Sequence, residues 1–247
     1  MIKFNELLEC GQNNDKVPTK KHKTMVPWVE KYRPLKLDDV AYQDDVKKML
    51  ITVIKTGNLP HLLFFGNSGS GKTSMILAIA RELFGPRKFE ERVIELNASD
   101  ERGINVVRNK IVTLAKIAVS EKDPDYLCPP YKIIILDEAD AMTTEAQSAL
   151  RKTMEDHSSV TRFCFICNYI NQIIDPITSR CVKFRFNPIT NDIMCDKLKI
   201  ISNKEHLKIS DDAVEKLASV SGGDMRKAIM YLQNLSYLGK TIDIDDV

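Results

Sequence analysis

The sequence lacks any segment that would hold the chain in a membrane or carry it through one. No run approaches the ~20 consecutive apolar residues that a membrane-spanning helix needs. The first residues are polar and contain no apolar secretory segment. An excess of one charge is also lacking, because 36 basic residues face 34 acidic ones and the formal net charge is +2. A protein coated in basic residues is therefore excluded, and only a local basic face could bind nucleic acid.

The cysteines lack the spacing of a disulfide framework, although the chain has six of them. Cys164 and Cys167 form a Cys-x-x-Cys pair, but they lie inside an apolar run. Buried thiols on a strand are therefore favoured over a metal or redox site. We expect an intracellular, reducing compartment. The hydrophobic fraction of 43% is ample for a core in one large or two modest domains.

What the sequence does contain is an alternation of short apolar strands with helices. Strands are predicted at residues 61–65, 93–96, 132–136, 161–167 and 182–186. Helices are predicted at 44–55, at 71–83 with an end near Gly85 and Pro86, at 101–119, and at 144–155 behind a box formed by Thr144 and Gln147. Buried strands that alternate with helices indicate an α/β fold with a parallel sheet and helices on both faces.

Three regions follow from the pattern. Residues 1–25 are polar and basic and are expected to form a flexible arm, for which a solvated tail is favoured over contact with DNA. Residues 26–188 hold the α/β domain. Residues 189–247 contain only helical patterns, at 192–202, at 211–219 behind a Ser210 cap and at 225–237, which predicts a small helical domain.

A complete phosphate-binding loop connects the first strand to the helix that follows it. It reads, in order, Gly66, Asn67, Ser68, Gly69, Ser70, Gly71, Lys72 and Thr73. The glycines let backbone N–H groups surround phosphate oxygens, and the helix N-terminus adds a partial positive charge. Lys72 is expected to reach the β- and γ-phosphates and Thr73 to hold Mg²⁺, so the predicted ligand is ATP with Mg²⁺.

Polar residues follow the third and fourth strands directly. Asp137 and Glu138 come after the third strand, at the carboxyl edge where open α/β sheets place ligands. Asp137 is expected to hold Mg²⁺, directly or through water, and Glu138 to polarise the attacking water as general base. Asn168 follows the fourth strand, where it would orient that water or sense the γ-phosphate, or serve as an ordinary turn residue.

Four further motifs occur together and in order. They are Pro-Trp-Val-Glu-Lys-Tyr-Arg-Pro at residues 27–34, Glu-Leu-Asn-Ala-Ser-Asp-Glu-Arg-Gly-Ile at 95–104, Asp-Glu-Ala-Asp at 137–140 and Ser-Arg-Cys at 179–181. This set resembles the small subunits of replication factor C, the clamp loader of eukaryotes and archaea, within the AAA+ ATPases. The resemblance covers residues 26–238. The runs at residues 128–132 and 163–169 are more similar to a eukaryotic-type subunit than to archaeal ones.

The resemblance implies a role for several individual residues. The segment from Val26 to Arg33, with Tyr32, is similar to the adenine pocket of the family. Asn168 matches its first sensor and Arg226 its second, so Arg226 would reach the γ-phosphate from a helical lid at residues 189–247. Arg180 matches the arginine finger, which acts in trans on ATP bound to a neighbouring subunit, although a surface salt bridge is the simpler interpretation of that residue alone.

The resemblance also implies partners. Clamp loaders are hetero-oligomeric rings, typically pentamers, that load a sliding clamp onto primer–template DNA, and a nuclear location is implied if the source is a cellular eukaryote. The helices bearing Arg102, Arg108 and Lys110 and bearing Arg151 and Lys152 would track DNA phosphates, unless these are solvated surfaces. Residues 120–131 are the expected clamp contact, with a plain connecting loop as the alternative.

The sequence departs from the family pattern in two places. The phosphate loop lacks the prolines and threonine that the family usually has. The sequence ends at Val247, before the helical collar domain that usually follows, which is expected either of a fragment or of a chain without that domain.

Two other functions are alternatives. A helicase would need a second RecA-like domain, for which residues 191–247 are too short. An ATP-binding assembly subunit with little turnover of its own would supply Arg180 to a neighbour and no more.

Overall fold

The structure is a computed structural model that describes residues 26–40, 43–99, 111–116 and 123–247. Within these ranges no helix is both long enough and apolar enough to cross a membrane. The strands are β1 (Leu62–Gly66), β2 (Val93–Asn97), β3 (Lys132–Asp137), β4 (Thr161–Cys167) and β5 (Val182–Phe186). The α-helices are α1 (Trp28–Lys31), α2 (Asp44–Thr56), α3 (Lys72–Arg92), α5 (Val112–Lys116), α6 (Thr144–Asp156), α7 (Asp175–Thr178), α8 (Asn191–Lys204), α9 (Asp211–Ser221) and α10 (Met225–Ser236).

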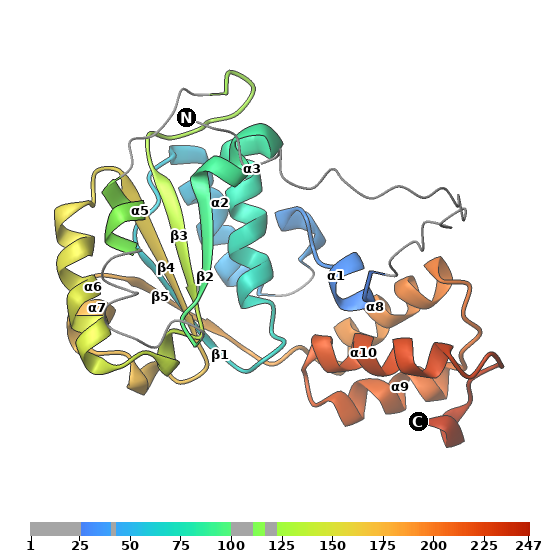
Figure 1. The fold of residues 1–247 in the computed structure, drawn as a ribbon. Coiled ribbons are helices and arrows are strands. Elements are labelled where there is room, and N and C mark those ends of the chain that lie inside the picture. The colour runs from blue at the N-terminus through green and yellow to red at the C-terminus, as the bar shows by residue number, and fades with distance from the viewer. Residues whose placement is uncertain (1–25, 41–42, 100–110, 117–122) are drawn as a thin grey trace, which may run out of the picture.

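The five strands form one parallel sheet in the order β2-β3-β4-β1-β5 (Figure 1). All four pairings are parallel, so every strand ends at the same edge of the sheet. Helices α2 and α3 cover one face and α5 and α6 the other, while α8, α9 and α10 form a separate bundle beyond the carboxyl edge (Figure 1). The predicted parallel sheet with helices on both faces is confirmed.

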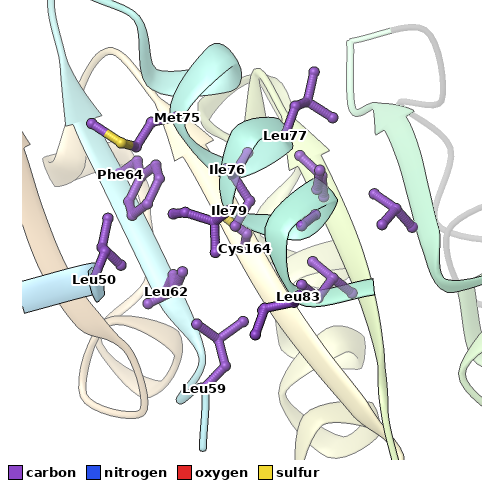
Figure 2. Packing of buried hydrophobic residues seen from close by; sticks show 14 of the residues in the cluster. Leu50, Leu59, Leu62, Phe64, Met75, Ile76, Leu77, Ile79, Leu83 and Cys164 are labelled. Atoms are coloured by element: carbon purple, nitrogen blue, oxygen red, sulfur yellow. The ribbon is translucent and has the colours of Figure 1, made fainter. Parts of the chain in front are cut away.

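The two faces of the sheet are built from alternating residues of the same strands. Leu62 and Phe64 of β1 pack against α3 in one cluster, whereas Leu63 packs in the cluster beneath α6. Figure 2 shows the first cluster, in which side chains of α3 lie over those of β1 and over Cys164 of β4. Burial on both faces explains why these strands are continuously apolar. Cys164 and Cys167 are buried thiols on β4, as predicted, and burial raises the pKa of Cys164 well above its usual value.

The three helices α8, α9 and α10 bury their own apolar cluster, which we call the lid bundle. Its core includes Met194, Leu217 and Leu232, one from each helix, and all three are fully buried. Trp28 of α1 also packs into this core. The short N-terminal helix therefore lies against the lid bundle, although the sequence interval 26–188 assigned it to the α/β domain.

The helix after the phosphate loop is longer than predicted. The expected end near Gly85 is a kink, because Gly85 has φ 68° and ψ 170° and the chain then continues in a helix to Arg92. Pro86 is the first residue of that second half, a position where a proline costs no hydrogen bond. The absence of a side chain at Gly85 leaves room for the Tyr126 ring, because a Cβ there would lie 2.4 Å from that ring.

The cap of α6 also differs from the prediction. Thr143, not Thr144, is the N-cap residue, and its hydroxyl accepts a hydrogen bond from the Ala146 N–H. Gln147 is buried and donates to the carbonyls of Met142 and Gln172, so it ties two loops together. Two adjacent threonines made the register ambiguous, and the extended backbone of Thr143 decided it. The Ser210 cap of α9 is confirmed.

A polar network closes the amino edge of the sheet, opposite the phosphate loop. The Phe163 N–H donates to Nδ1 of His61 at 3.1 Å, which requires that nitrogen to be unprotonated. Burial, together with the nearby Arg162 guanidinium, lowers the pKa of His61 to about 4. Arg162 in turn donates to the Leu59 carbonyl and lies over the Tyr131 ring.

The fold should therefore lose stability in mild acid through His61. The pKa of His61 in the folded protein, about 4, lies below the usual value of 6.5, so the unfolded chain binds a proton at this residue more readily than the folded one. The contribution of neutral His61 to the free energy of unfolding is therefore complete above pH 6.5 and is lost as the pH falls toward 4. Allowing for partial exposure, we expect a loss of about 1 to 2 kcal/mol between pH 7.5 and pH 5. Urea unfolding of the wild type and of His61→Gln at both pH values measures this, and an equal pH dependence in the two proteins would contradict it.

Candidate functional site

All three glycines of the phosphate loop have positive φ, and at two of them a side chain would also clash with a neighbouring segment. Gly66 has φ +141°, and a Cβ there would lie 2.2 Å from the Phe186 carbonyl oxygen of β5. Gly69 has φ +66°, and a Cβ there would lie 1.8 Å from Oδ1 of Asp224 in the lid bundle. Gly66 thus lets β1 and β5 remain paired as far as the start of the loop. Gly69 lets the lid bundle approach the loop.

Lys72 lies at the centre of the loop with its ammonium group turned back into it. Nζ donates to the carbonyls of Gly66 at 2.7 Å and Asn67 at 2.9 Å, and to Oδ1 of Asn168 at 3.0 Å. Burial lowers the pKa of Lys72, while the Asp137 carboxylate opposes that shift. The ammonium group is therefore held by neutral acceptors, and a phosphate would offer it a charged partner.

Thr73 and Asp137 place two oxygens where a metal ion would be held. Thr73 Oγ1 donates to Asp137 Oδ2 at 2.7 Å, close to the roughly 2.9 Å between adjacent oxygens of an octahedral Mg²⁺ shell. The described residues contain no cluster of three or more histidine, cysteine or acidic side chains that could hold a metal alone. Mg²⁺ would therefore need phosphate oxygens and water to complete its shell, as it usually does.

The carboxyl ends of β3 and β4 meet beside the loop. Glu138 follows β3 in a left-handed conformation, with φ 54° and ψ 39°, which is uncommon for a residue with a side chain and is found at functional sites. It is exposed and lines the same cavity as Lys72. Asp140 accepts hydrogen bonds from the backbone N–H groups of Asn168 and Tyr169, so it fixes the turn that presents Asn168.

The lid bundle contacts the loop directly. The N–H of Met225 donates to the Gly69 carbonyl at 3.3 Å, and Asp224 caps α10 by accepting from the Lys227 N–H. Arg226 follows at the first turn of α10 and lines the cavity with Lys72. A cation from the lid bundle and a cation from the loop thus face the same space, which favours a polyanionic ligand.

This cavity has a volume of about 370 Å³, within the usual range for small-molecule sites. The polar part of its lining is formed by loop residues 68–73, Asp137, Glu138 and Asn168. The more apolar part of its lining is formed by Val29, Tyr32, Arg33, Pro34, Ile193 and Ile229. A triphosphate fits the first part by charge, and a planar base fits the second.

Three of the predicted binding residues are not among those that line the cavity. Val26 is 56% exposed and is not part of the cavity wall, because the chain enters helix α1 only after Pro27 and the next apolar residue of that segment to reach the wall is Val29. Gly66 and Asn67 contribute carbonyl acceptors for Lys72, whereas Ser68 to Thr73 line the cavity.

Arg180 lies outside this cavity, in the turn between α7 and β5. Its guanidinium group pairs with Glu155 of α6 at 2.5 Å and donates to the Pro176 carbonyl at 2.7 Å, and its side chain is 37% exposed. It therefore cannot touch a ligand bound to the phosphate loop of its own chain without leaving these partners. The pairing with Glu155 is a surface salt bridge, which was the simpler interpretation of Arg180 from the sequence alone.

The predicted DNA-contacting residues fall into two groups. Arg151 and Lys152 of α6 are exposed, and Arg151 lies 3.7 Å from Glu155 one turn along the helix. Lys152 lines an open groove between α5 and α6 together with Lys116 and His157. Arg102, Arg108 and Lys110 lie outside the described residues.

Several cavity residues were not predicted from the sequence. Asn97 ends β2 and Glu95 precedes it, and both line the cavity; burial raises the pKa of Glu95. The rule that polar residues at carboxyl strand ends form sites, applied above to β3 and β4, would have found Asn97. Lys197 and Ile193 of α8 carry no local signal, because only the packing of the lid bundle brings them to the cavity.

Two family models match the sequence. The model described as "ATPase family associated with various cellular activities (AAA)" matches residues 62–189, and the "RCF1/5-like, AAA+ ATPase lid domain" model matches residues 196–236. The fold and the site thus define a P-loop domain of the AAA+ class with a helical lid.

Curated relatives identify the family within that class. The chain is 54% identical over 223 residues to replication factor C subunit 2 of Oryza sativa, covering 90% of this chain and 66% of that protein. It is 56% identical over 220 residues to replication factor C subunit 4 of Homo sapiens, covering 88% and 61%. The replication factor C small subunit of Archaeoglobus fulgidus is 49% identical, covering 89% and 67%. The chain belongs to the replication factor C small-subunit family.

The chain spans about two thirds of the length of these relatives. Among solved structures, the Thermotoga maritima RuvB Holliday junction branch migration motor matches with a TM-score of 0.66 over 87% of this chain and 70% of that chain. Its sequence identity of 19% means that this likeness concerns the fold alone.

Proposed function

We propose that the chain is a clamp-loader subunit that binds and hydrolyses ATP to load a ring-shaped sliding clamp onto primer–template DNA. The observation that carries this proposal is the division of the catalytic parts. Lys72, Thr73, Asp137, Glu138 and Arg226 surround one cavity, while Arg180 is exposed elsewhere on the surface. A site that lacks its own arginine finger needs a neighbouring subunit to complete it.

The chemistry follows from these positions. Backbone N–H groups of the loop and the Lys72 ammonium group bind phosphate oxygens, and Arg226 binds them from the lid. Thr73 and Asp137 would hold Mg²⁺, which would supply positive charge to neutralise charge on the phosphates. Glu138 takes a proton from the attacking water, and Asn168, fixed by Asp140 and hydrogen-bonded to Lys72, orients that water. Arg180 stabilises transition-state charge on ATP bound to the next subunit.

The remaining partners are proposed from surface features. The exposed Arg151 and Lys152 of α6 and the groove beside them fit a contact with DNA phosphates, which carries no sequence information. Tyr126 and Leu127 are exposed apolar residues in the segment that precedes β3, and they fit a contact with the sliding clamp. Other subunits would complete a hetero-oligomeric ring, and replication in a nucleus is the proposed setting.

Reconstitution tests this function. The chain is combined with candidate partner subunits and a sliding clamp, and the ATPase rate is measured with and without primed DNA. We expect a stable complex whose rate rises several-fold when clamp and primed DNA are added together. A stable complex whose ATPase rate does not change when clamp and primed DNA are added would contradict clamp loading.

A further inference from the structure

One carboxylate of the lid bundle holds the segment that forms the apolar wall of the cavity. Oε1 of Glu205 accepts a hydrogen bond from the Tyr32 hydroxyl at 2.5 Å and another from Nζ of Lys31 at 2.5 Å. Glu205 is the C-cap residue of α8, and its side chain is only 17% exposed. A charged hydrogen bond that is mostly sheltered from water is among the stronger polar contacts in a protein.

The other end of α1 is also held by the lid bundle. The Trp28 N–H donates to Oε1 of Gln233 in α10 at 2.9 Å, and the indole ring is buried in the lid core. The Tyr32 ring packs edge-on against the Trp28 ring, with centroids 6.5 Å apart and planes at 87°. Tyr32 is thus fixed on its ring edge by Trp28 and at its hydroxyl by Glu205, which leaves its side chain a single orientation.

That orientation places Tyr32 in the cavity wall. Tyr32 lines the cavity together with Val29, Ile193 and Ile229. Neither Glu205 nor Lys31 is part of the wall. Glu205 can therefore affect a ligand only through the residues that it contacts, of which Tyr32 lines the cavity, and Nζ of Lys31 lies 5.4 Å from the centroid of the Tyr32 ring.

We propose that Glu205 is a positioning residue for ATP binding, which holds the Tyr32 ring where the adenine base contacts it. This inference rests on the proposed function, because it assumes that the more apolar part of the cavity lining receives the base. Without Glu205 the Tyr32 side chain regains its rotamers, and each binding event must order it again. Triphosphate binding at the loop does not depend on this contact.

Calorimetric titration of the full chain with Mg·ATP and, separately, with inorganic tripolyphosphate tests the proposal. Tripolyphosphate occupies the loop but has no base. We expect Glu205→Ala and Tyr32→Phe each to weaken ATP binding about tenfold, the size of one lost charged hydrogen bond. Both variants should bind tripolyphosphate as the wild type does. The double variant should be no weaker than either single one, because both remove the same contact.

Lys199→Met is the control, since it removes an exposed ion pair of α8, with Asp211, and Lys199 does not line the cavity. We expect its ATP affinity to stay within about twofold of the wild type. ATP affinity unchanged in both Glu205→Ala and Tyr32→Phe would overturn the proposal. An equal loss of ATP and tripolyphosphate would also overturn it, because the effect would then act on the lid as a whole. A wild-type chain that binds tripolyphosphate but not ATP would instead contradict the proposed function.

Discussion

Replacing Glu138 by Gln should abolish ATP hydrolysis at this site while ATP remains bound. The amide cannot accept the proton of the attacking water, and the loss of a positioned general base costs about 10² to 10⁴ in rate. Binding should survive because Lys72, Thr73 and Arg226 supply the phosphate contacts and Glu138 forms no hydrogen bond with any of them. Single-turnover hydrolysis by the reconstituted complex, compared with ATP titration of the chain, measures the two effects separately.

The same variant separates an active subunit from a purely structural one. If this subunit binds ATP only as an assembly part, Glu138→Gln would leave the ATPase rate of the complex unchanged, and the proposed hydrolysis at this site would be wrong. Glu90→Gln is a suitable control, because Glu90 is an exposed carboxylate of α3 beyond its kink and lies outside the cavity and outside the groove between α5 and α6. We expect that control to hydrolyse ATP as the wild type does.

Replacing Arg180 by Ala should reduce hydrolysis at the neighbouring site by about 10³-fold or more. The ATPase rate of the whole complex would then fall by the share that this one site contributes. ATP binding to the altered chain itself should not change, because Arg180 pairs with Glu155 and contacts no part of its own cavity. The measurements are ATPase of the complex and ATP titration of the isolated variant.

The control for Arg180 is Arg185→Ala, which removes an exposed arginine of β5 that is likewise absent from the cavity. We expect that variant to match the wild type in both measurements. If Arg180→Ala instead weakened ATP binding by its own chain, the residue would act in cis and the shared site would be disproved. Loss of complex formation by Arg180→Ala would show an assembly role, which a size measurement on the mixture reveals.

The strands and the phosphate loop could be predicted because their signals are local. An apolar run such as residues 132–136 needs only burial on two faces, and the loop needs only its glycines and its lysine between a strand and a helix. The parallel sheet then brought Asp137 and Asn168 to one edge, since β3 and β4 are neighbours. Lys72 and Asn168, which are 96 residues apart, meet at 3.0 Å because β1, which leads into the loop, pairs with β4.

What the sequence did not predict depends on backbone detail or on packing between distant segments. Gly85 and Pro86 together predict a helix end, but only Gly85 leaves the helical conformation, with positive φ, and the helix continues after it to Arg92. Neither Glu205 nor Lys197 has a local pattern that marks it, because both act through the way the lid bundle lies against α1 and the loop. Val26 was assigned to the cavity by resemblance alone, and the path of the chain places Val29 there instead.

Titration of the isolated chain with Mg·ATP tests the central claim, that the cavity between the loop and the lid is an ATP site. We predict one ATP per chain and an affinity that falls on the order of 100-fold in Lys72→Met, because that variant removes the charged donor to the phosphates. Lys88→Met, which replaces a half-buried lysine that pairs with Glu91 in α3 beyond its kink and outside the cavity, should bind as the wild type does. A folded wild type that binds no ATP, or binds it equally well without Lys72, would contradict the account.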